Sequence, residues 1–277
     1  MTKLSNLATR VIVALFGVPL IITLCIVGKV PFLIFVLVIG VVSFFEFHKM
    51  LARRRFIPNV LVSSASVITL ILNSYLSFTD FYTLAIIIVS ILLLAELQRN
   101  RESAIANVGT SLIGIFYIGL FSSSLVKLRD FYSDSFFLYD QGGYLIVSIF
   151  ASIWICDSAA YFVGSAIGKH KILPRVSPHK SWEGAIAGLI FSIAIMIAAK
   201  NLIADFLSMH DAVIIGIITG TIGQAGDFVE SMLKRDANVK DSSSLIPGHG
   251  GILDRFDSLL FTAPVVYLYL LFTNHIF

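Results

Sequence analysis

The chain has 277 residues, of which 57% are hydrophobic and 13% are charged. A soluble domain is usually about 45–50% apolar and about 25% charged, so this composition excludes an ordinary water-soluble fold and predicts that lipid covers most of the surface. The formal net charge of +3 is too small to indicate a nucleic acid partner, and we expect none. Both cysteines lie in apolar stretches, which favours neither a disulfide framework nor a zinc site.

Nine apolar stretches follow one another along the chain, each near the roughly 20 residues that cross a bilayer as a helix. They are residues 11–28, 30–47, 59–78, 81–97, 108–126, 143–166, 183–203, 212–233 and 257–277. The sequence therefore predicts an all-α, polytopic integral membrane protein with about nine transmembrane helices. No small-residue cleavage site closes the first stretch, so we interpret it as a retained span and not as a signal peptide.

The distribution of basic residues predicts the orientation. Of the 20 Lys and Arg residues, sixteen fall in the N-terminal segment and the even-numbered loops, and the others are Lys29, Lys127, Arg129 and Lys200. Basic residues in short loops favour the cytoplasm. We therefore expect the N-terminus in the cytoplasm and the C-terminus outside, in the inner (plasma) membrane.

The two halves of the chain differ in character. Residues 1–127 are predicted to form N-terminal transmembrane helices with short basic loops. Residues 128–277 have polar side chains inside their apolar stretches, and they include two long loops, 167–182 and 234–256, that we place in the cytoplasm. We expect the catalytic region there.

The eighth apolar stretch contains two acidic residues, Asp227 and Glu230. A charged side chain at membrane depth costs about 2.5–3.5 kcal/mol on insertion scales. Helical spacing puts both on one face with Gly223, Ser231 and Lys234, so we expect Asp227 to face a packed or wet interior. A structural ion pair near the membrane surface is the alternative.

The segment after this stretch combines three features of phosphate chemistry. Lys234, Arg235 and Lys240 are cations, and residues 247–251 (PGHGG) predict a tight turn whose N–H groups form an anion-binding concavity. Asp254 and Asp257 share a face if the last helix begins there. Asp227 returning towards Asp254 would make a carboxylate pair suited to Mg²⁺. A plain turn and a surface ion pair are the alternative readings.

A second set of polar residues lies earlier in the chain, between Asp157 and Glu183. Asp157 in the sixth stretch shares a helical face with Tyr161, Gly164, Ser165 and Gly168. The next loop contains Lys169, Lys171, Arg175 and Lys180, a cluster that would hold a triphosphate or anionic lipid headgroups. Ser177-Pro178 predicts a turn, Ser181 a helix cap and Glu183 a first-turn acid. A purely topological basic loop and a packing role for Asp157 are the alternatives.

Together these residues resemble the phosphatidate cytidylyltransferases over about residues 157–257. The family signature is filled by Ser231, Lys234, Arg235, Lys240, Asp241, Ser243, Pro247, His249, Gly250, Gly251, Asp254, Arg255 and Asp257. Its upstream elements are matched by Asp157, Ala160, Tyr161 and Gly164, and by Ser177, Pro178, Lys180, Trp182, Glu183 and Gly184. One position departs, because His179 stands where the family commonly has Lys.

The resemblance implies a Mg²⁺-dependent transfer of CMP from CTP to phosphatidate at the cytoplasmic face, giving CDP-diacylglycerol and pyrophosphate. It implies Asp227 and Asp254 as metal ligands, with Asp257 and Asp157 as further candidates and a second cation left open. It also implies a homodimer in the lipid bilayer. The catalytic set that it implies is Asp227, Lys234, Asp254 and Asp257. The substrate-binding set is Asp157, Ser177, Lys180, Ser231, Arg235, Lys240, Asp241, His249, Gly250, Gly251 and Arg255.

Two other function classes stay open at this point. A CTP-dependent kinase of a membrane lipid alcohol would use similar groups but attack the γ-phosphorus. An ion-coupled transporter would place Asp157, Asp227 and Glu230 on an ion path, although transporters of this kind have midplane sites between repeats, and we find no repeat. A CDP-alcohol phosphotransferase is disfavoured because its paired Asp array is absent from the sequence.

Overall fold

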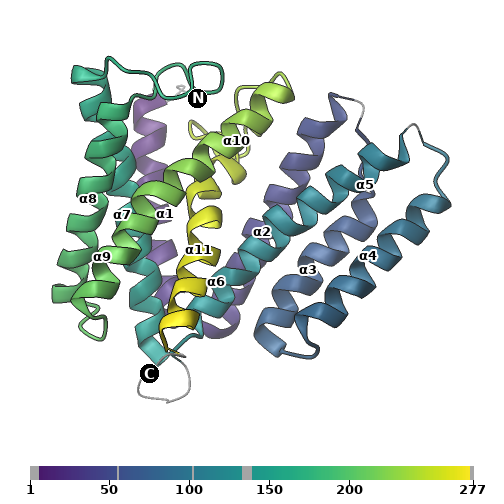
Figure 1. The fold of residues 1–277 in the computed structure, drawn as a ribbon, viewed down its shortest axis with the longest axis horizontal. Helices are drawn as coiled ribbons and strands as arrows, with labels where there is room; N and C mark the ends of the chain where they lie inside the picture. The colour runs from purple at the N-terminus through teal and green to yellow at the C-terminus, as the bar shows by residue number, and fades with distance from the viewer. Residues whose placement is uncertain (1–5, 55, 102, 133–138, 275–277) are drawn as a thin grey trace. The chain divides into compact units, whose positions relative to one another are not determined.

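The computed structural model describes residues 6–54, 56–101, 103–132 and 139–274, and these residues form helices joined by short loops (Figure 1). Within the described ranges the only β-structure is two isolated bridges. Seven helices of this part of the chain are long and apolar enough to cross a membrane. The prediction of an all-α polytopic membrane protein is therefore confirmed.

The helices follow the predicted stretches in chain order, with η marking a π-helix. They are α1 (Asn6–Val27), α2 (Lys29–Ala52), α3 (Val60–Leu76), α4 (Phe81–Leu97), α5 (Ala104–Ile113), η1 (Gly114–Leu120), α6 (Phe121–Arg129), α7 (Tyr139–Ile167), α8 (Trp182–Leu202), α9 (Met209–Ile218), η3 (Thr219–Gly223), α10 (Gln224–Asp236) and α11 (Leu253–Asn274).

Two of the nine predicted stretches form shorter apolar helices, because α3 and α4 have 17 residues each. Two others contain a π-helical turn, one between α5 and α6 and one between α9 and α10. A π-turn inserts extra residues into a helix and occurs frequently at functional sites. The last two helices also extend beyond their predicted ends, so the loop expected at 234–256 is shorter and comprises residues 237–252.

The chain forms two compact units, and each is described by itself. The first contains the N-terminal helix as far as Leu24, Lys29–Lys127 and Asp236–Phe256. The second contains Cys25–Gly28, Leu128–Arg235 and Asp257–Phe277. The region predicted as 128–277 is thus divided between the units, because the loop after α10 belongs to the unit of the N-terminal helices.

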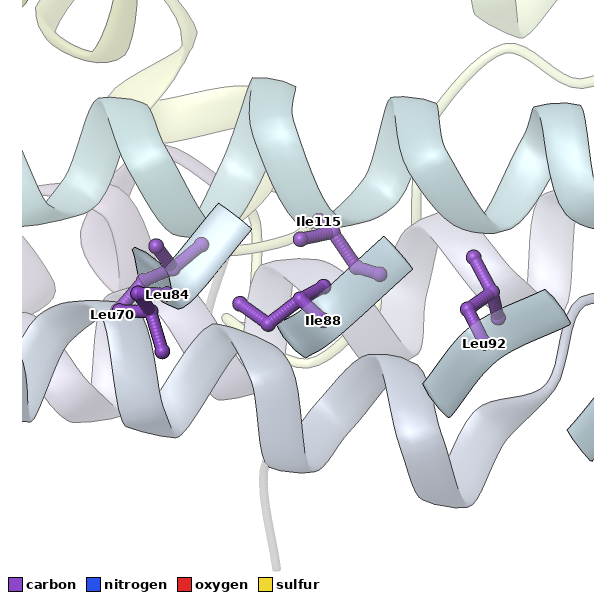
Figure 2. Close-up of a cluster of buried hydrophobic side chains, with 5 residues drawn as sticks. All are labelled: Leu70, Leu84, Ile88, Leu92 and Ile115. Carbon is purple, nitrogen blue, oxygen red and sulfur yellow. The ribbon is translucent and has the colours of Figure 1, made fainter. Parts of the chain in front are cut away.

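One cluster of buried apolar side chains in the first unit lies between α3, α4 and η1. Leu84, Ile88 and Leu92 follow one another at four-residue intervals and form one buried stripe of α4, which packs against Leu70 of α3 and Ile115 of η1 (Figure 2). The next residue, Leu93, is 52% exposed. Lipid is as apolar as leucine, so close packing and not avoidance of water decides which face of α4 turns inward.

Small residues let α7, α8 and α9 of the second unit approach one another closely. A Cβ at Gly184 would lie 2.6 Å from the carbonyl oxygen of Ala160, and one at Gly216 would lie 2.7 Å from the Cα of Ile193. The hydroxyl of Ser152 donates to the carbonyl of Ser192 at 3.2 Å. Glycine contacts and inter-helix hydrogen bonds of this kind hold helices together in a bilayer.

Candidate active site

Three acidic side chains meet in the second unit. Asp227 and Glu230 lie one turn apart on α10, and Asp257 comes from α11. One carboxylate oxygen from each lies within 4.8 Å of the others. Glu230 and Asp257 are buried, and Asp227 is half-buried. Asp227 contacts other polar side chains here, while Glu230 and Asp257 are the more deeply buried pair; both the expected packed or wet interior and the alternative of a structural ion pair stay predictions.

Glycines of α10 and the preceding π-turn make this meeting possible. A Cβ at Gly226 would lie 2.8 Å from the Cβ of Phe261 and 2.9 Å from the carbonyl oxygen of Asp257. A Cβ at Gly223 would lie 3.0 Å from the hydroxyl of Thr262. Only hydrogen fits at Gly226, so α10 approaches the backbone of α11 closely enough for their acidic side chains to share one space.

Two lysines compensate part of the negative charge. Lys180 forms an ion pair with Asp227, and Lys234 forms one with Glu230 a turn further along α10. The Ser231 hydroxyl donates to Asp227 Oδ1 at 3.3 Å. When all five charged groups are ionised, three carboxylates face two ammonium groups. Buried charge is costly unless it is paired, so the excess negative charge favours a bound cation.

The loop between α7 and α8 brings Lys180 to this place. Lys171 and Ser181 form an isolated antiparallel bridge, and the Trp182 amide donates to the His170 carbonyl at 2.9 Å. The Ser181 hydroxyl then caps α8 by accepting from the Gly184 amide at 3.3 Å, as the sequence predicted. Lys180 directly precedes this cap, and its ammonium group lies 4.6 Å from the ring centroid of Phe228.

Other predicted residues of the second unit lie around this region at different exposures. The Arg235 guanidinium donates to the carbonyl of Val176 at 3.2 Å, which ties α10 to the α7–α8 loop. Ser177 is half-buried, and its amide donates to the Leu173 carbonyl at 2.9 Å, which closes the turn that precedes it; the predicted Ser177-Pro178 turn follows at residues 178–179. Asp157 is exposed on α7; it is not one of the three carboxylates within 4.8 Å of one another, but its charge acts on Asp257.

Asp254 belongs to a different group, in the first unit. Its carboxylate accepts hydrogen bonds from the Ser242 amide (2.9 Å), the Ser242 hydroxyl (2.8 Å) and the Gly251 amide (2.8 Å). These donors assign Asp254 a role in bracing the loop at residues 237–252, which we call the Gly-rich loop. Its predicted pairing with Asp227 as a metal ligand joins residues of two units and stays a prediction.

The Pro247–Gly251 turn of the Gly-rich loop forms as predicted. Gly248 and Gly250 have φ angles of +76° and +85°, which side-chain-bearing residues rarely adopt. Ile246 and Gly250 form an isolated bridge across the turn. His249 is half-buried beside it. The remaining predicted substrate contacts of this unit are exposed: Lys240, Asp241 and Arg255.

Sequence reasoning missed Glu46 of α2. Its side chain is 4% exposed, and its carboxylate accepts hydrogen bonds from the Gly-rich loop and from the first residue of α11. The available signal was an acidic residue inside an apolar stretch, the same signal that identified Asp227 and Glu230. It was overlooked because its partners lie about 200 residues away in the chain.

Comparisons with known proteins agree with these observations. A family profile described as the cytidylyltransferase family matches residues 8–273. A phosphatidate cytidylyltransferase of Brucella suis biovar 1 (strain 1330) is 34% identical over 268 residues, covering 96% of this chain and 94% of that protein. One from Bacillus subtilis (strain 168) is 32% identical over 274 residues, covering 96% and 98%. One from Synechocystis sp. (strain ATCC 27184 / PCC 6803 / Kazusa) is 32% identical over 283 residues, covering 94% and 95%.

The close approach at Gly226 leads to a stability prediction. We expect Gly226→Ala to lower the free energy of unfolding in detergent by about 1–3 kcal/mol, because the new methyl group overpacks the contact with α11. Gly109→Ala is the matched control, since nothing lies within 4 Å of a Cβ there. Denaturant titration of both variants is the measurement. Equal stability of Gly226→Ala and wild type would contradict the role given to Gly226.

Proposed function

The chain belongs to the cytidylyltransferase family, and from that premise we propose that it transfers CMP from CTP to phosphatidate, giving CDP-diacylglycerol and pyrophosphate. The observation that carries the proposal is the cluster of Asp227, Glu230 and Asp257 with its two paired lysines. The cluster lies in a polytopic membrane protein, which a lipid substrate can reach from the surrounding bilayer. The three similar bacterial proteins reported above are each named phosphatidate cytidylyltransferase.

The proposed reaction is a single displacement at phosphorus. A phosphate oxygen of phosphatidate attacks the α-phosphorus of CTP, and the bond from that phosphorus to the α–β bridging oxygen breaks. Pyrophosphate leaves with the bonding electrons, and a new P–O–P linkage remains in the lipid. The second pKa of a phosphomonoester is about 6, so the nucleophile is mostly dianionic at pH 7 and needs little general base catalysis.

The main obstacle is then electrostatic repulsion between two anionic substrates. Lys180 and Lys234 supply positive charge within the second unit, and both are anchored by acidic partners. Fixed cations that need no reorganisation during the reaction stabilise a phosphoryl-transfer transition state effectively. We therefore assign to these lysines the neutralisation of phosphate charge. The same role for Arg235, Lys240 and Arg255 rests on the family resemblance.

The three carboxylates fit Mg²⁺ by the chemistry of their donors. Mg²⁺ takes hard oxygen ligands and usually binds one or two protein carboxylates together with substrate phosphate oxygens. Asp227, with Glu230 and Asp257, would hold the ion, and Asp254 stays a further candidate from the resemblance. When bound, Mg²⁺ would neutralise phosphate charge and polarise the α-phosphoryl group. A second cation would bind carboxylate oxygens of the same three side chains.

We also propose a nine-span topology with the N-terminus in the cytoplasm, the C-terminus outside and the reaction at the cytoplasmic face of the inner membrane. The charge distribution supports this orientation. The short helices α3 and α4 decide the count, and their 17 residues lie at the lower limit of about 17–25 for a transmembrane helix. The homodimer expected from the resemblance stays a prediction.

Labelled CTP tests the proposed reaction directly. We expect purified protein in liposomes containing phosphatidate and Mg²⁺ to move the α-phosphate label of CTP into lipid and to release the γ-phosphate label as pyrophosphate. Asp227→Asn should lower the rate by about 100-fold or more, because a charged group of the reaction site is removed.

Asp205→Asn provides the matched control for this assay. Asp205 is exposed in the loop after α8, lies outside the carboxylate cluster, and should retain the wild-type rate. Transfer of the γ-label to a lipid acceptor would replace the proposal by a lipid kinase. Absence of nucleotide turnover with phosphatidate would contradict it and favour the transporter alternative.

Cysteine labelling tests the nine-span topology. Phe78 precedes α4 and Arg101 follows it, and both are exposed, whereas the native Cys25 and Cys156 are buried. We expect a membrane-impermeant maleimide added to intact cells to label Phe78→Cys and not Arg101→Cys, because α4 separates the two sides. Equal labelling of both positions would show that α4 does not cross the membrane.

A further inference from the structure

Glu46 is an acidic side chain buried in an apolar helix. It lies in α2 between Phe44 and Phe47, which are 0% and 1% exposed, and it is itself 4% exposed. A carboxylate in such surroundings is stable only when hydrogen bonds replace its hydration. The hydrogen-bond partners of Glu46 therefore indicate its role in the structure.

All four of its partners come from one segment of the first unit, on either side of the Pro247–Gly251 turn. Oε1 accepts from the Ser243 hydroxyl (2.5 Å) and the Ile252 amide (3.1 Å). Oε2 lies 3.1 Å from the Ser242 hydroxyl and accepts from the Leu253 amide (2.8 Å). Each oxygen thus contacts one residue before the turn and one after it, so a single carboxylate closes the base of the turn.

The contact has a second consequence for α11. Leu253 is the first residue of that helix, and the amides of a helix's first turn have no partner within the helix. A carboxylate at this end satisfies such amides and favours the helix dipole. Glu46 therefore fixes where α11 begins, and with it the position of Asp254 in the first turn.

Two neighbouring residues show how closely the segment is held. A Cβ at Gly251 would lie 2.0 Å from the Ser242 hydroxyl and 2.6 Å from Glu46 Oε2, so the contact requires glycine there. The Ser242 hydroxyl also lies 2.8 Å from Asp254 Oδ2. A hydroxyl has one proton, so Ser242 lies between Glu46 and Asp254 and donates to only one of the two carboxylates at a time. On the far side of the turn, Arg10 of α1 donates to the Gly248 carbonyl at 2.8 Å.

We propose that Glu46 is a positioning residue for the reaction, which holds the Pro247–Gly251 turn in the conformation that binds the nucleotide. The inference rests on the proposed function and on the predicted role of this turn in nucleotide binding. It assigns a functional part to the N-terminal helices, which the sequence showed only as apolar spans. A turn that is already ordered binds its ligand without the cost of ordering it.

Glu46→Gln tests the proposal with little change in shape. The carboxamide keeps one acceptor oxygen and presents an NH₂ group in place of the other. A serine hydroxyl can still accept from this NH₂ group, but the backbone amide of Ile252 or Leu253 loses its acceptor, so the contact after the turn is weakened. We expect the KM for CTP to rise about fivefold or more, with a much smaller change in kcat, because ordering of the turn then accompanies binding. We also expect amide exchange in residues 246–253 to quicken about tenfold.

Glu96→Gln is the matched control. Glu96 is also 4% exposed and also lies in the first unit, but its carboxylate accepts from Arg99 and Asn107. It should leave the KM for CTP and the exchange of residues 246–253 unchanged, even if the variant unfolds at a lower denaturant concentration.

Three outcomes would overturn the proposal. One is a KM for CTP in Glu46→Gln equal to that of wild type, and another is an equal rise of KM in Glu96→Gln, which would reveal general destabilisation. The third is unchanged amide exchange in the turn. If wild-type protein transfers no α-label, the proposed function itself fails, and the exchange measurement still decides whether Glu46 holds the turn.

Discussion

The close approach of α10 to α11 is the constraint on which the candidate site depends. Three carboxylates share a space of 4.8 Å among apolar helices, an arrangement that electrostatic repulsion and lost hydration both oppose. Gly226 permits the approach, and Lys180 and Lys234 offset most of the charge. The remaining negative charge favours a divalent cation. The cap at Ser181 and the folded α7–α8 loop place Lys180 beside Asp227.

The acidic residues of the two units are stabilised in two different ways. In the second unit, Asp227 forms an ion pair with Lys180, so the opposite charge of the lysine stabilises the carboxylate. In the first unit, Asp254 is surrounded by hydroxyl and backbone N–H donors, with Glu46 beside it through Ser242. Ion pairs leave a carboxylate able to exchange its partner for a metal, whereas several backbone donors fix the conformation of a loop. The two units thus differ: the paired carboxylate of the second is suited to binding a cation, and the hydrogen-bonded carboxylates of the first are suited to holding a loop.

The sequence predicted the features that depend on local patterns. Apolar stretches located the helices, the spacing from Asp227 to Lys234 located the acidic face of α10, and the Pro247–Gly251 turn and the Ser181 cap form as expected. Features that depend on packing between distant segments were not predictable. Periodicity put Glu230 on the same face as Asp227, but it could not show that Asp257 joins them, or that Glu46 contacts residues about 200 positions away. The π-turn before α10 also leaves no distinct local pattern.

We propose that Asp227, Glu230 and Asp257 bind the divalent cation of the reaction. Crystals of the protein grown with Mn²⁺ in place of Mg²⁺ would locate the ion by anomalous scattering. We expect an anomalous peak coordinated by oxygens of this cluster, and a much weaker peak in Asp257→Asn. A peak held elsewhere, for example at Asp254 without any member of the cluster, would show that these three carboxylates are not the metal ligands.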